Sequence, residues 1–169
     1  MPNQKEDLAF GRQSETDNLE LLQQFLQTTL NKTDDYCVYD FESDDKSIMV
    51  ELKSRRIRHD QYETVFIGWN KIVFCERMTR EGVKFHLAFA FSDGLYTIQY
   101  DPELFADFEV RHDFRRSARE DASNAPSSIC LIPTKHLKKV EPRPTTTVAP
   151  PPLVEDVGDE KEEAPYFYQ

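Results

Sequence analysis

Residues 40–55, DFESDDKSIMVELKSR, decide the fold that the sequence predicts. They contain a polar turn, SDDK, between two segments rich in aromatic and β-branched side chains, YCVYDFE (36–42) and SIMVELKS (47–54). Two such segments joined by a short polar turn predict a β-hairpin. The second strand is unusual because Glu51 and Lys53 interrupt an apolar run that is expected to be buried.

The alternation of side chains along a strand predicts which residues of the hairpin meet. A turn centred on Asp44 and Asp45 would pair Asp40 with Met49 and Glu51 with Val38. One face would then carry Asp40, Met49, Glu51 and Lys53, and the other would carry Tyr39, Phe41, Ile48, Val50 and Leu52. On this pairing Asp40 and Glu51 are diagonal neighbours about 7–8 Å apart, a span that one cation between their tips can bridge.

The segment before the hairpin, SETDNLELLQQFLQTTLN (14–31), predicts a helix with Ser14 as its N-cap. Apolar residues follow at helical spacing: Leu19, Leu22, Phe25, Leu26 and Leu30. Glu15 lies at the centre of this stripe, so its carboxylate points to the edge of the core. The alternative is a hydrated first-turn glutamate that interacts favourably with the helix dipole.

The rest of the chain predicts further strands and short helices. The expected helices are DQYETVFIGWN (60–70) and TKHLKKV (134–140). The expected strands are KIVFCERM (71–78), VKFHLAFAF (83–91), LYTIQY (95–100), FEVRH (108–112) and SICLIP (128–133), with a polar loop at 115–127. Together these elements predict a single domain of the mixed α/β class.

Glu15, Asp40 and VELKSR (50–55) form a pattern that resembles the PD-(D/E)xK phosphodiesterase superfamily, over about residues 11–100. The pattern is most similar to the Holliday-junction-resolvase and phage-exonuclease branches. The resemblance implies a restriction-endonuclease-like core, in which an N-terminal helix is followed by a β-hairpin and further strands of an α+β mixed sheet, flanked by helices. It also implies a divalent-metal-dependent DNA nuclease, and the absence of an attached recognition domain favours structure-selective cutting.

The same resemblance implies a role for each residue of the pattern. Asp40 and Glu51 would hold Mg²⁺ or Mn²⁺ together with the backbone carbonyl of Leu52, and Glu15 would complete the metal shell. Lys53 would position the attacking water and the scissile phosphate. The residue types suit this chemistry, because hard cations prefer oxygen ligands and activate water, while a lysine supplies a point charge.

A basic strip, Arg55, Arg56 and Arg58, leads out of the predicted site and is the expected DNA-binding segment. Gln61, Tyr62 and Lys71 are secondary candidates. The four histidines, His59, His86, His112 and His136, have no metal-ligand spacing and supply no evident nucleophile and base pair, so we interpret them as incidental.

Composition limits the remaining possibilities. The 169 residues carry a net charge of −10, and length and charge distribution predict one domain over 1–140 and a Pro-rich acidic tail over 141–169. The tail is expected to be disordered or bound to a protein partner. The sequence lacks a long apolar run and a signal-peptide pattern, which predicts an intracellular protein, cytoplasmic or nuclear or of viral or phage origin, without membrane contact. The three cysteines are expected to be buried thiols.

Two alternatives to the nuclease stay open at this stage. A nuclease-fold scaffold or virion-type structural component, bound through the tail, would suit the acidic net charge, which disfavours non-specific DNA binding. An ordinary edge hairpin with a charged end would leave Glu15 away from Asp40 and Glu51. A homodimer is a further partner candidate.

Overall fold

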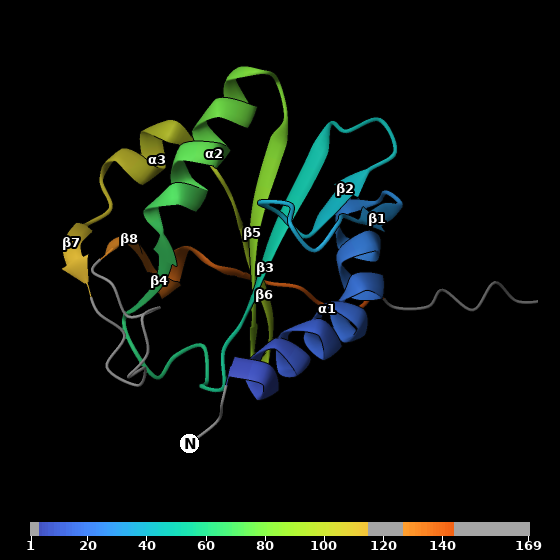
Figure 1. Cartoon of the computed structure of the whole chain (residues 1–169), viewed down its shortest axis with the longest axis horizontal. Helices are drawn as coiled ribbons and strands as arrows, with labels where there is room; N and C mark the ends of the chain where they lie inside the picture. The colour runs from blue at the N-terminus through green and yellow to red at the C-terminus, as the bar shows by residue number, and fades with distance from the viewer. Residues whose placement is uncertain (1–3, 115–126, 144–169) are drawn as a thin grey trace, which may run out of the picture.

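In the computed structural model, residues 4–114 and 127–143 are described (Figure 1). The helices are α1 (Gln4–Leu26), α2 (Trp69–Arg80) and α3 (Pro102–Ala106), with a 3₁₀ turn at Thr134–His136. A six-stranded sheet has the order β1 (Leu30–Lys32), β2 (Phe41–Ser43), β3 (Ile48–Ser54), β5 (Lys84–Phe91), β6 (Gly94–Gln99) and β9 (Lys138–Lys139). A three-stranded sheet has the order β4 (Thr64–Gly68), β8 (Ser127–Pro133) and β7 (Val110–Phe114).

The larger sheet is mixed. β3 and β5 are parallel, and the other neighbouring strands of this sheet are antiparallel. Parallel neighbours need a crossover connection, and here β4 and α2 provide it. The mixed sheet behind an N-terminal helix confirms the predicted α/β class and the restriction-endonuclease-like core.

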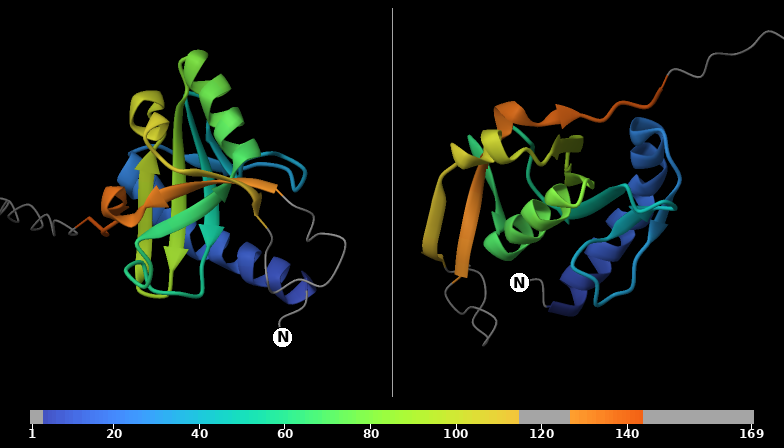
Figure 2. Two further views of the ribbon diagram at one scale, coloured as in Figure 1. Left: turned by 90° about the vertical axis from the view of Figure 1, so that its left-hand side faces the viewer. Right: turned by 90° about the horizontal axis from the view of Figure 1, so that it is seen from above.

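Two hydrophobic cores lie on opposite faces of the larger sheet. Odd-numbered residues of β3 and β5, such as Met49 and Phe85, belong to the core that contains Ile72 of α2 and the inner face of the smaller sheet. Even-numbered residues, such as Val50, belong to the core that contains Leu22 of α1. Figure 2 shows α1 and α2 on the two sides of the sheet in its right-hand view. β3 therefore lies between two layers, so a charged residue within this strand can be enclosed in the interior of the molecule.

The predicted hairpin is present, but its first strand is shorter than expected. β2 begins at Phe41, which pairs with Val50, so the pairing of Asp40 with Met49 is wrong by two residues. The turn explains this register, because Asp45 accepts hydrogen bonds from the Ser43 hydroxyl (2.7 Å) and from both the amide and the hydroxyl of Ser47. These bonds lower the pKa of Asp45 to about 2, with the Ser47 hydroxyl as the main cause. A shift of two residues leaves every side chain of β3 on its expected face.

The residues before β2 do not continue the strand. Tyr39 was expected on the face of Val50 and Leu52, but it packs in the opposite core, stacked on Phe74 with ring centroids 5.6 Å apart. Strand alternation does not apply there, because the chain from Cys37 to Asp40 is bent. The predicted position of Val38 opposite Glu51 is wrong for the same reason.

The N-terminal helix begins much earlier than predicted. α1 starts at Gln4, so Ser14 is a buried residue inside the helix and not its N-cap. The side-chain amide of Asn18 donates to the Ser14 carbonyl (2.7 Å) and hydroxyl (3.3 Å). Gly11 in the helix interior costs roughly 1 kcal/mol relative to alanine and hides this extension in the sequence. The helix ends at Leu26, and Leu30 is buried as the first residue of β1.

For residues 60–80 the sequence predicted a helix followed by a strand, whereas the structure has a strand followed by a helix. The expected helix at 60–70 contains strand β4, in which Val65 and Ile67 alternate into the core. The expected strand at 71–78 lies in helix α2, whose buried residues Ile72, Cys75 and Met78 follow at intervals of three. Gly68, with φ −61° and ψ 140°, is the extended residue where strand changes to helix.

Later elements follow the prediction more closely. The strands predicted at 83–91, 95–100, 108–112 and 128–133 correspond to β5, β6, β7 and β8. The helix expected at 134–140 is only a 3₁₀ turn followed by β9. Helix α3 was not predicted, although its start is marked by Asp101, whose side chain accepts hydrogen bonds from the amides of Glu103 and Leu104, and by Pro102.

Other expectations concern the cysteines, the polar loop, the tail and membranes. The three cysteines are free thiols; Cys75 and Cys130 are buried, and Cys37 is half-buried. The polar loop predicted at 115–127 lies outside the described residues except for Ser127, and most of the predicted tail, 144–169, lies outside them too. Within the described part of the chain, no helix is both long and apolar enough to span a bilayer.

Candidate active site

Glu51 is the most deeply buried carboxylate of the described chain. It lies on β3 with 1% of its surface exposed, and its Oε1 is 2.5 Å from the Lys53 Nζ and 3.0 Å from the Lys71 Nζ. Its carboxylate oxygens have no hydrogen-bond partner of suitable geometry among the described residues. Burial of a charged carboxylate is costly unless the charge is paired. The two lysines therefore explain how Glu51 remains in the core, and Oε2 is left without an ion-pair contact.

Lys71 reaches Glu51 because it lies in the first turn of α2, which covers the face of the sheet to which Glu51 points. Its ammonium group also donates a hydrogen bond to the Val38 carbonyl. Lys71 thus connects α2, β3 and the bend before β2. The sequence named Lys71 as a secondary candidate, but placed it in a strand.

Asp40 lies immediately before β2, which begins at Phe41, and takes the place of a preceding strand residue opposite β3. Its amide donates to the Val50 carbonyl (3.0 Å), and its Oδ2 accepts from the Leu52 amide (2.7 Å). Burial raises the pKa of Asp40 to about 6, with a further increase from the charges of Glu51 and Glu15; the Leu52 amide and Lys53 oppose the rise. Asp40 therefore lies within electrostatic range of both other acids.

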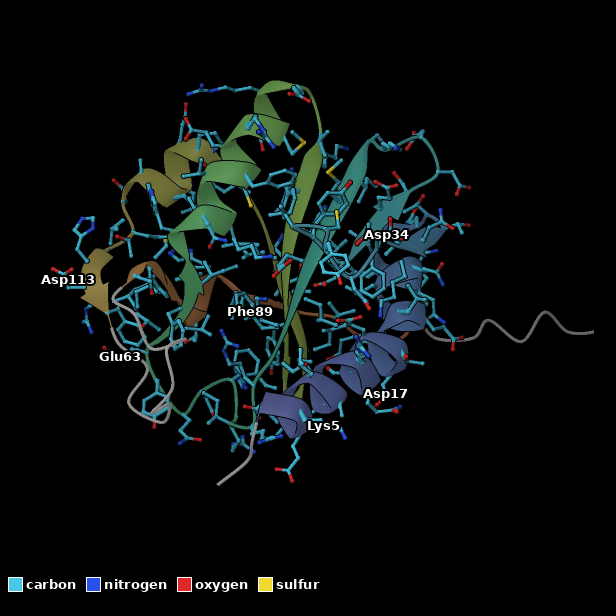
Figure 3. The ribbon with its side chains drawn as sticks, viewed as in Figure 1. Lys5, Asp17, Asp34, Glu63, Phe89 and Asp113 are labelled. Carbon is cyan, nitrogen blue, oxygen red and sulfur yellow. The ribbon has the colours of Figure 1, made fainter. Side chains whose placement is uncertain are left out.

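Glu15 approaches from α1. It forms an ion pair with Lys32 of β1, with 2.7 Å between Oε2 and Nζ, and its side chain is 17% exposed. Glu15, Asp40 and Lys53 line one cleft of about 380 Å³. Glu15 and Asp40 also line a neighbouring cleft of about 190 Å³, beside Asp34, which is labelled in Figure 3. The structure thus brings Glu15, Asp40 and Lys53 to one cleft, with Glu51 buried next to Lys53.

These acids offer oxygen donors that fit a hard divalent cation. Oε2 of Glu51 is unpartnered among the described residues, and Asp40 uses Oδ2 for the Leu52 amide. The N–H and C=O of one strand residue point to the same neighbour, so the Leu52 carbonyl points toward Asp40, beyond the end of β2. Asp40 and the Leu52 carbonyl therefore face the same side of β3, and oxygen donors of this kind suit a hard divalent cation such as Mg²⁺ or Mn²⁺.

The carboxylates of Glu15, Asp40 and Glu51 do not converge on a single point. Among the described residues, the group of three potential ligands whose atoms all lie within 4.8 Å of one another is His59, Asp60 and Asp93. There His59 Nδ1 is 2.5 Å from Asp93 Oδ2 and its ring stacks on Tyr96. No sequence pattern indicated this second cluster. Glu51 and Glu15 are instead paired with lysines: Glu51 with Lys53 and Lys71, and Glu15 with Lys32.

The three arginines of the basic strip have different surroundings. Arg55 lines the cleft but donates to the Phe66 carbonyl (2.9 Å), with its guanidinium 5.0 Å from the centre of the Phe66 ring. Arg56 also lines the cleft and pairs with Asp7 (3.3 Å). Arg58 does not line it and instead contacts Asp60 (3.1 Å) and Asp93 (3.7 Å).

The other secondary candidates lie apart from this cleft. Gln61 and Tyr62 are exposed on the loop between β3 and β4, and the Gln61 side chain donates to the Tyr62 hydroxyl (3.4 Å). Within the described chain, no contact links them to Glu51 or Asp40. Their part in DNA binding stays a prediction.

The sequence did not identify Asp7 and Phe10, which line the larger cleft, or Lys32, which lines the neighbouring one. Asp7 and Phe10 follow from the longer α1, which continues past the expected N-cap. Continued helical spacing upstream of Ser14 was the available signal. Lys32 had no local signal, because it meets Glu15 only when β1 folds back beside α1.

A protein-family model described as Phage putative PDDEXK endonuclease matches residues 3–140. The match begins with α1 and ends just after β9, so it covers every helix and strand described above. It contains all the residues of the cleft. No curated protein matches the chain.

Proposed function

Because the chain belongs to this family of phage PDDEXK endonucleases, we propose that it hydrolyses phosphodiester bonds of DNA with Mg²⁺ or Mn²⁺ as cofactor. The main support is Glu51, a buried carboxylate with an unpartnered oxygen beside a lysine and the perturbed Asp40. A carboxyl group in a cleft with a raised pKa, such as that of Asp40, is typical of functional sites. A purely structural strand would gain stability from an apolar residue in place of Glu51.

Each residue has a distinct role in this proposal. Asp40, Glu51 and the Leu52 carbonyl would hold the cation, with Glu15 completing its surroundings. The bound cation would supply an activated water at neutral pH and would stabilise negative charge on the phosphate. Lys53, at the cleft and 35% exposed, would orient the phosphate and the water by its positive charge.

Arg56 and the rest of the strip would bind phosphates next to the cleft. Arg56 is exposed, whereas Arg55 is held against Phe66. Arg56 therefore offers the more adaptable phosphate contact, and Arg55 helps to fix the wall of the cleft. The small volume of the cleft, about 380 Å³, favours cutting that depends on DNA structure more than on a long recognition sequence.

The test compares cleavage of supercoiled, linear and branched DNA in Mn²⁺, Mg²⁺ and EDTA. The variants are Glu51→Gln and Lys53→Ala, with Glu20→Gln, an exposed acid of α1, as the matched control. We expect cleavage by the wild type and the control only with metal, and loss of at least about 100-fold in Glu51→Gln, comparable with the loss of an essential electrostatic group.

Equal cleavage by the wild type and both site variants would contradict the proposal. Calorimetric titration with Mn²⁺ gives a second readout, in which binding by the wild type should disappear in Asp40→Asn. Absence of both cleavage and metal binding would favour the non-enzymatic scaffold instead.

A further inference from the structure

The N-terminal half of α1 presents large apolar side chains next to the candidate active site. Leu8 and Phe10 are 58% and 40% exposed. Single exposed apolar residues are common and need no explanation. The position of Phe10 is what distinguishes it, because its ring borders both the catalytic cleft and a second hollow.

The second hollow, of about 550 Å³, lies between α1 and the turn that joins β5 to β6. Arg55 and Arg56 line it as well as the catalytic cleft, so Phe10 and these arginines form the wall between the two. In Figure 3 this part of α1 lies between the labelled residues Lys5 and Asp17. Phe91, Ser92 and Leu95 line the hollow from the side of the β5–β6 turn, and Asn18 lines it from α1.

Arg56 and Phe10 are in direct contact. The guanidinium carbon of Arg56 is 4.4 Å from the centre of the Phe10 ring. An aromatic face next to a phosphate-binding cation is the combination with which proteins bind single-stranded nucleic acids, because the base stacks on the ring while the cation holds the backbone. Acids are also present: Asp7 pairs with Arg56, and Asp17 lines the second hollow. A phosphate would have to compete with Asp7 for Arg56.

The size of the cleft limits what can enter. A volume of about 380 Å³ is at the low end of small-ligand sites, which span roughly 300–1,000 Å³.

A base inside a duplex is stacked on both sides, so the Phe10 ring can only stack on a base that is unpaired or flipped out. Flipping a base out of a duplex costs a few kcal/mol. The ring therefore favours DNA in which the nucleotide beside the scissile bond is already unpaired.

We propose that Phe10, backed by Arg56, is a stacking site for an unpaired nucleobase, and that the substrate of this nuclease is DNA with a single-stranded segment, such as a flap or frayed end. The second hollow accepts the neighbouring nucleotide of the same strand, and Arg55 and Arg56 follow the backbone between the two hollows. This inference rests on the proposed nuclease function and adds a substrate class to it.

Binding is measured first, in EDTA, so that no cleavage is needed. The probe is a flap oligonucleotide with 2-aminopurine in the unpaired strand near the junction, and a fully paired duplex with the same label is the comparison. Stacking on Phe10 quenches the fluorescence of the flap probe. In Phe10→Ala we expect quenching to disappear and affinity for the flap to fall about five- to tenfold, at the lower end of base–aromatic stacking because the ring is partly exposed. Affinity for the duplex should change less than twofold.

The matched control is Phe25→Ala, which removes a similarly exposed ring (36%) from the other end of α1. Phe25→Ala should leave both probes unaffected, and Phe10→Tyr, which keeps an aromatic ring, should restore quenching. Thermal denaturation of each variant checks that α1 remains folded. Equal loss of flap and duplex binding in Phe10→Ala, or unchanged quenching, would overturn the stacking site.

Cleavage in Mn²⁺ then separates this inference from the proposed function. Wild-type preference for flap over duplex, reduced in Phe10→Ala by the same factor as binding, supports the substrate class. Cleavage that is equal on flap and duplex overturns the substrate class while leaving the nuclease proposal intact. Failure to cut any substrate contradicts the proposed function, whereas the fluorescence result still decides whether Phe10 stacks on a base.

Discussion

Replacing Asp40 with asparagine should stabilise the protein in the absence of metal. The pKa of Asp40 rises from 3.8 to about 6, chiefly through burial and then through the charge of Glu51. A rise of about two units corresponds to about 3 kcal/mol against the ionised form at neutral pH. Asparagine removes this charge and can still accept the hydrogen bond from the Leu52 amide. The gain at pH 7.5 should therefore be up to about 3 kcal/mol.

The pH dependence of this gain follows from the direction of the shift. A carboxyl group whose pKa is higher in the folded state binds its proton more tightly there, so the wild type is relatively stable below pH 3.8 and loses that stability as the pH rises through about 6. The difference between Asp40→Asn and the wild type should be largest above pH 6 and should vanish near pH 4.

The assay is thermal denaturation in EDTA and in Mn²⁺, at pH 7.5 and at pH 4.5. In EDTA at pH 7.5 the variant should melt roughly 6–12 °C above the wild type, at ~2–4 °C per kcal/mol. Saturating Mn²⁺ should reduce or reverse this difference in melting temperature, because a ligand at 100 times its dissociation constant adds about 2.7 kcal/mol to the free energy of unfolding of the wild type alone. Asp107→Asn, an exposed acid at the end of α3, is the control. A lower melting temperature for Asp40→Asn at pH 7.5 in EDTA would refute the reasoning.

Three further predictions concern the surroundings of the site. Lys71→Met removes one of the two cations at Glu51. It should lower the free energy of unfolding, measured by urea denaturation, by roughly 1–3 kcal/mol, which is less than for a complete break of a buried pair because Lys53 remains. An unchanged free energy of unfolding would mean that Lys71 does not neutralise Glu51. Leu22→Ala, at a fully buried position between α1 and β3, should cost about 2–5 kcal/mol, whereas Leu8→Ala, at an exposed position, should cost less than about 0.5 kcal/mol. Residues 144–169 carry six acids and one lysine. Their deletion should leave the melting temperature nearly unchanged and should tighten DNA binding at low salt only, where the repulsion between these acids and DNA is not screened. A tighter complex that persists at high salt would argue against this electrostatic repulsion.

The elements that the sequence predicted well are those with strong local signals. The β5–β6 pair combines long apolar runs with a short turn at Asp93 and Gly94, and the hairpin turn at Ser43 has its own hydrogen bonds. Residues 71–78 were misassigned to a strand because Ile, Val and Phe at the start of α2 have high β-propensity, while the decisive helical spacing of Ile72, Cys75 and Met78 extends over a longer window.

The candidate site depends on contacts that no local pattern encodes. The sequence indicated Glu15, Asp40, Glu51 and Lys53 because charges at a strand end need an explanation. It could not reveal that Lys71 comes to Glu51 from a helix on one face, while Lys32 comes to Glu15 on α1, which packs on the other face. The Lys71 pairing follows from the crossover between β3 and β5, which brings α2 to β3, and the Lys32 pairing follows from β1 folding back beside α1.

The lysines also explain how such a site can be stable before a metal binds. Every acid of the cluster has a compensating partner: Glu51 has Lys53 and Lys71, Glu15 has Lys32, and Asp40 has the Leu52 amide. A cation that enters among these acids must compete with ammonium groups, and their release lowers the net gain in binding energy. Lys53 lines the cleft, so on the proposed mechanism it would be available to the phosphate once a cation neutralised Glu51. On the proposed mechanism, Lys53 would both stabilise the metal-free fold and position the substrate, and metal binding and substrate positioning would then be coupled through Lys53.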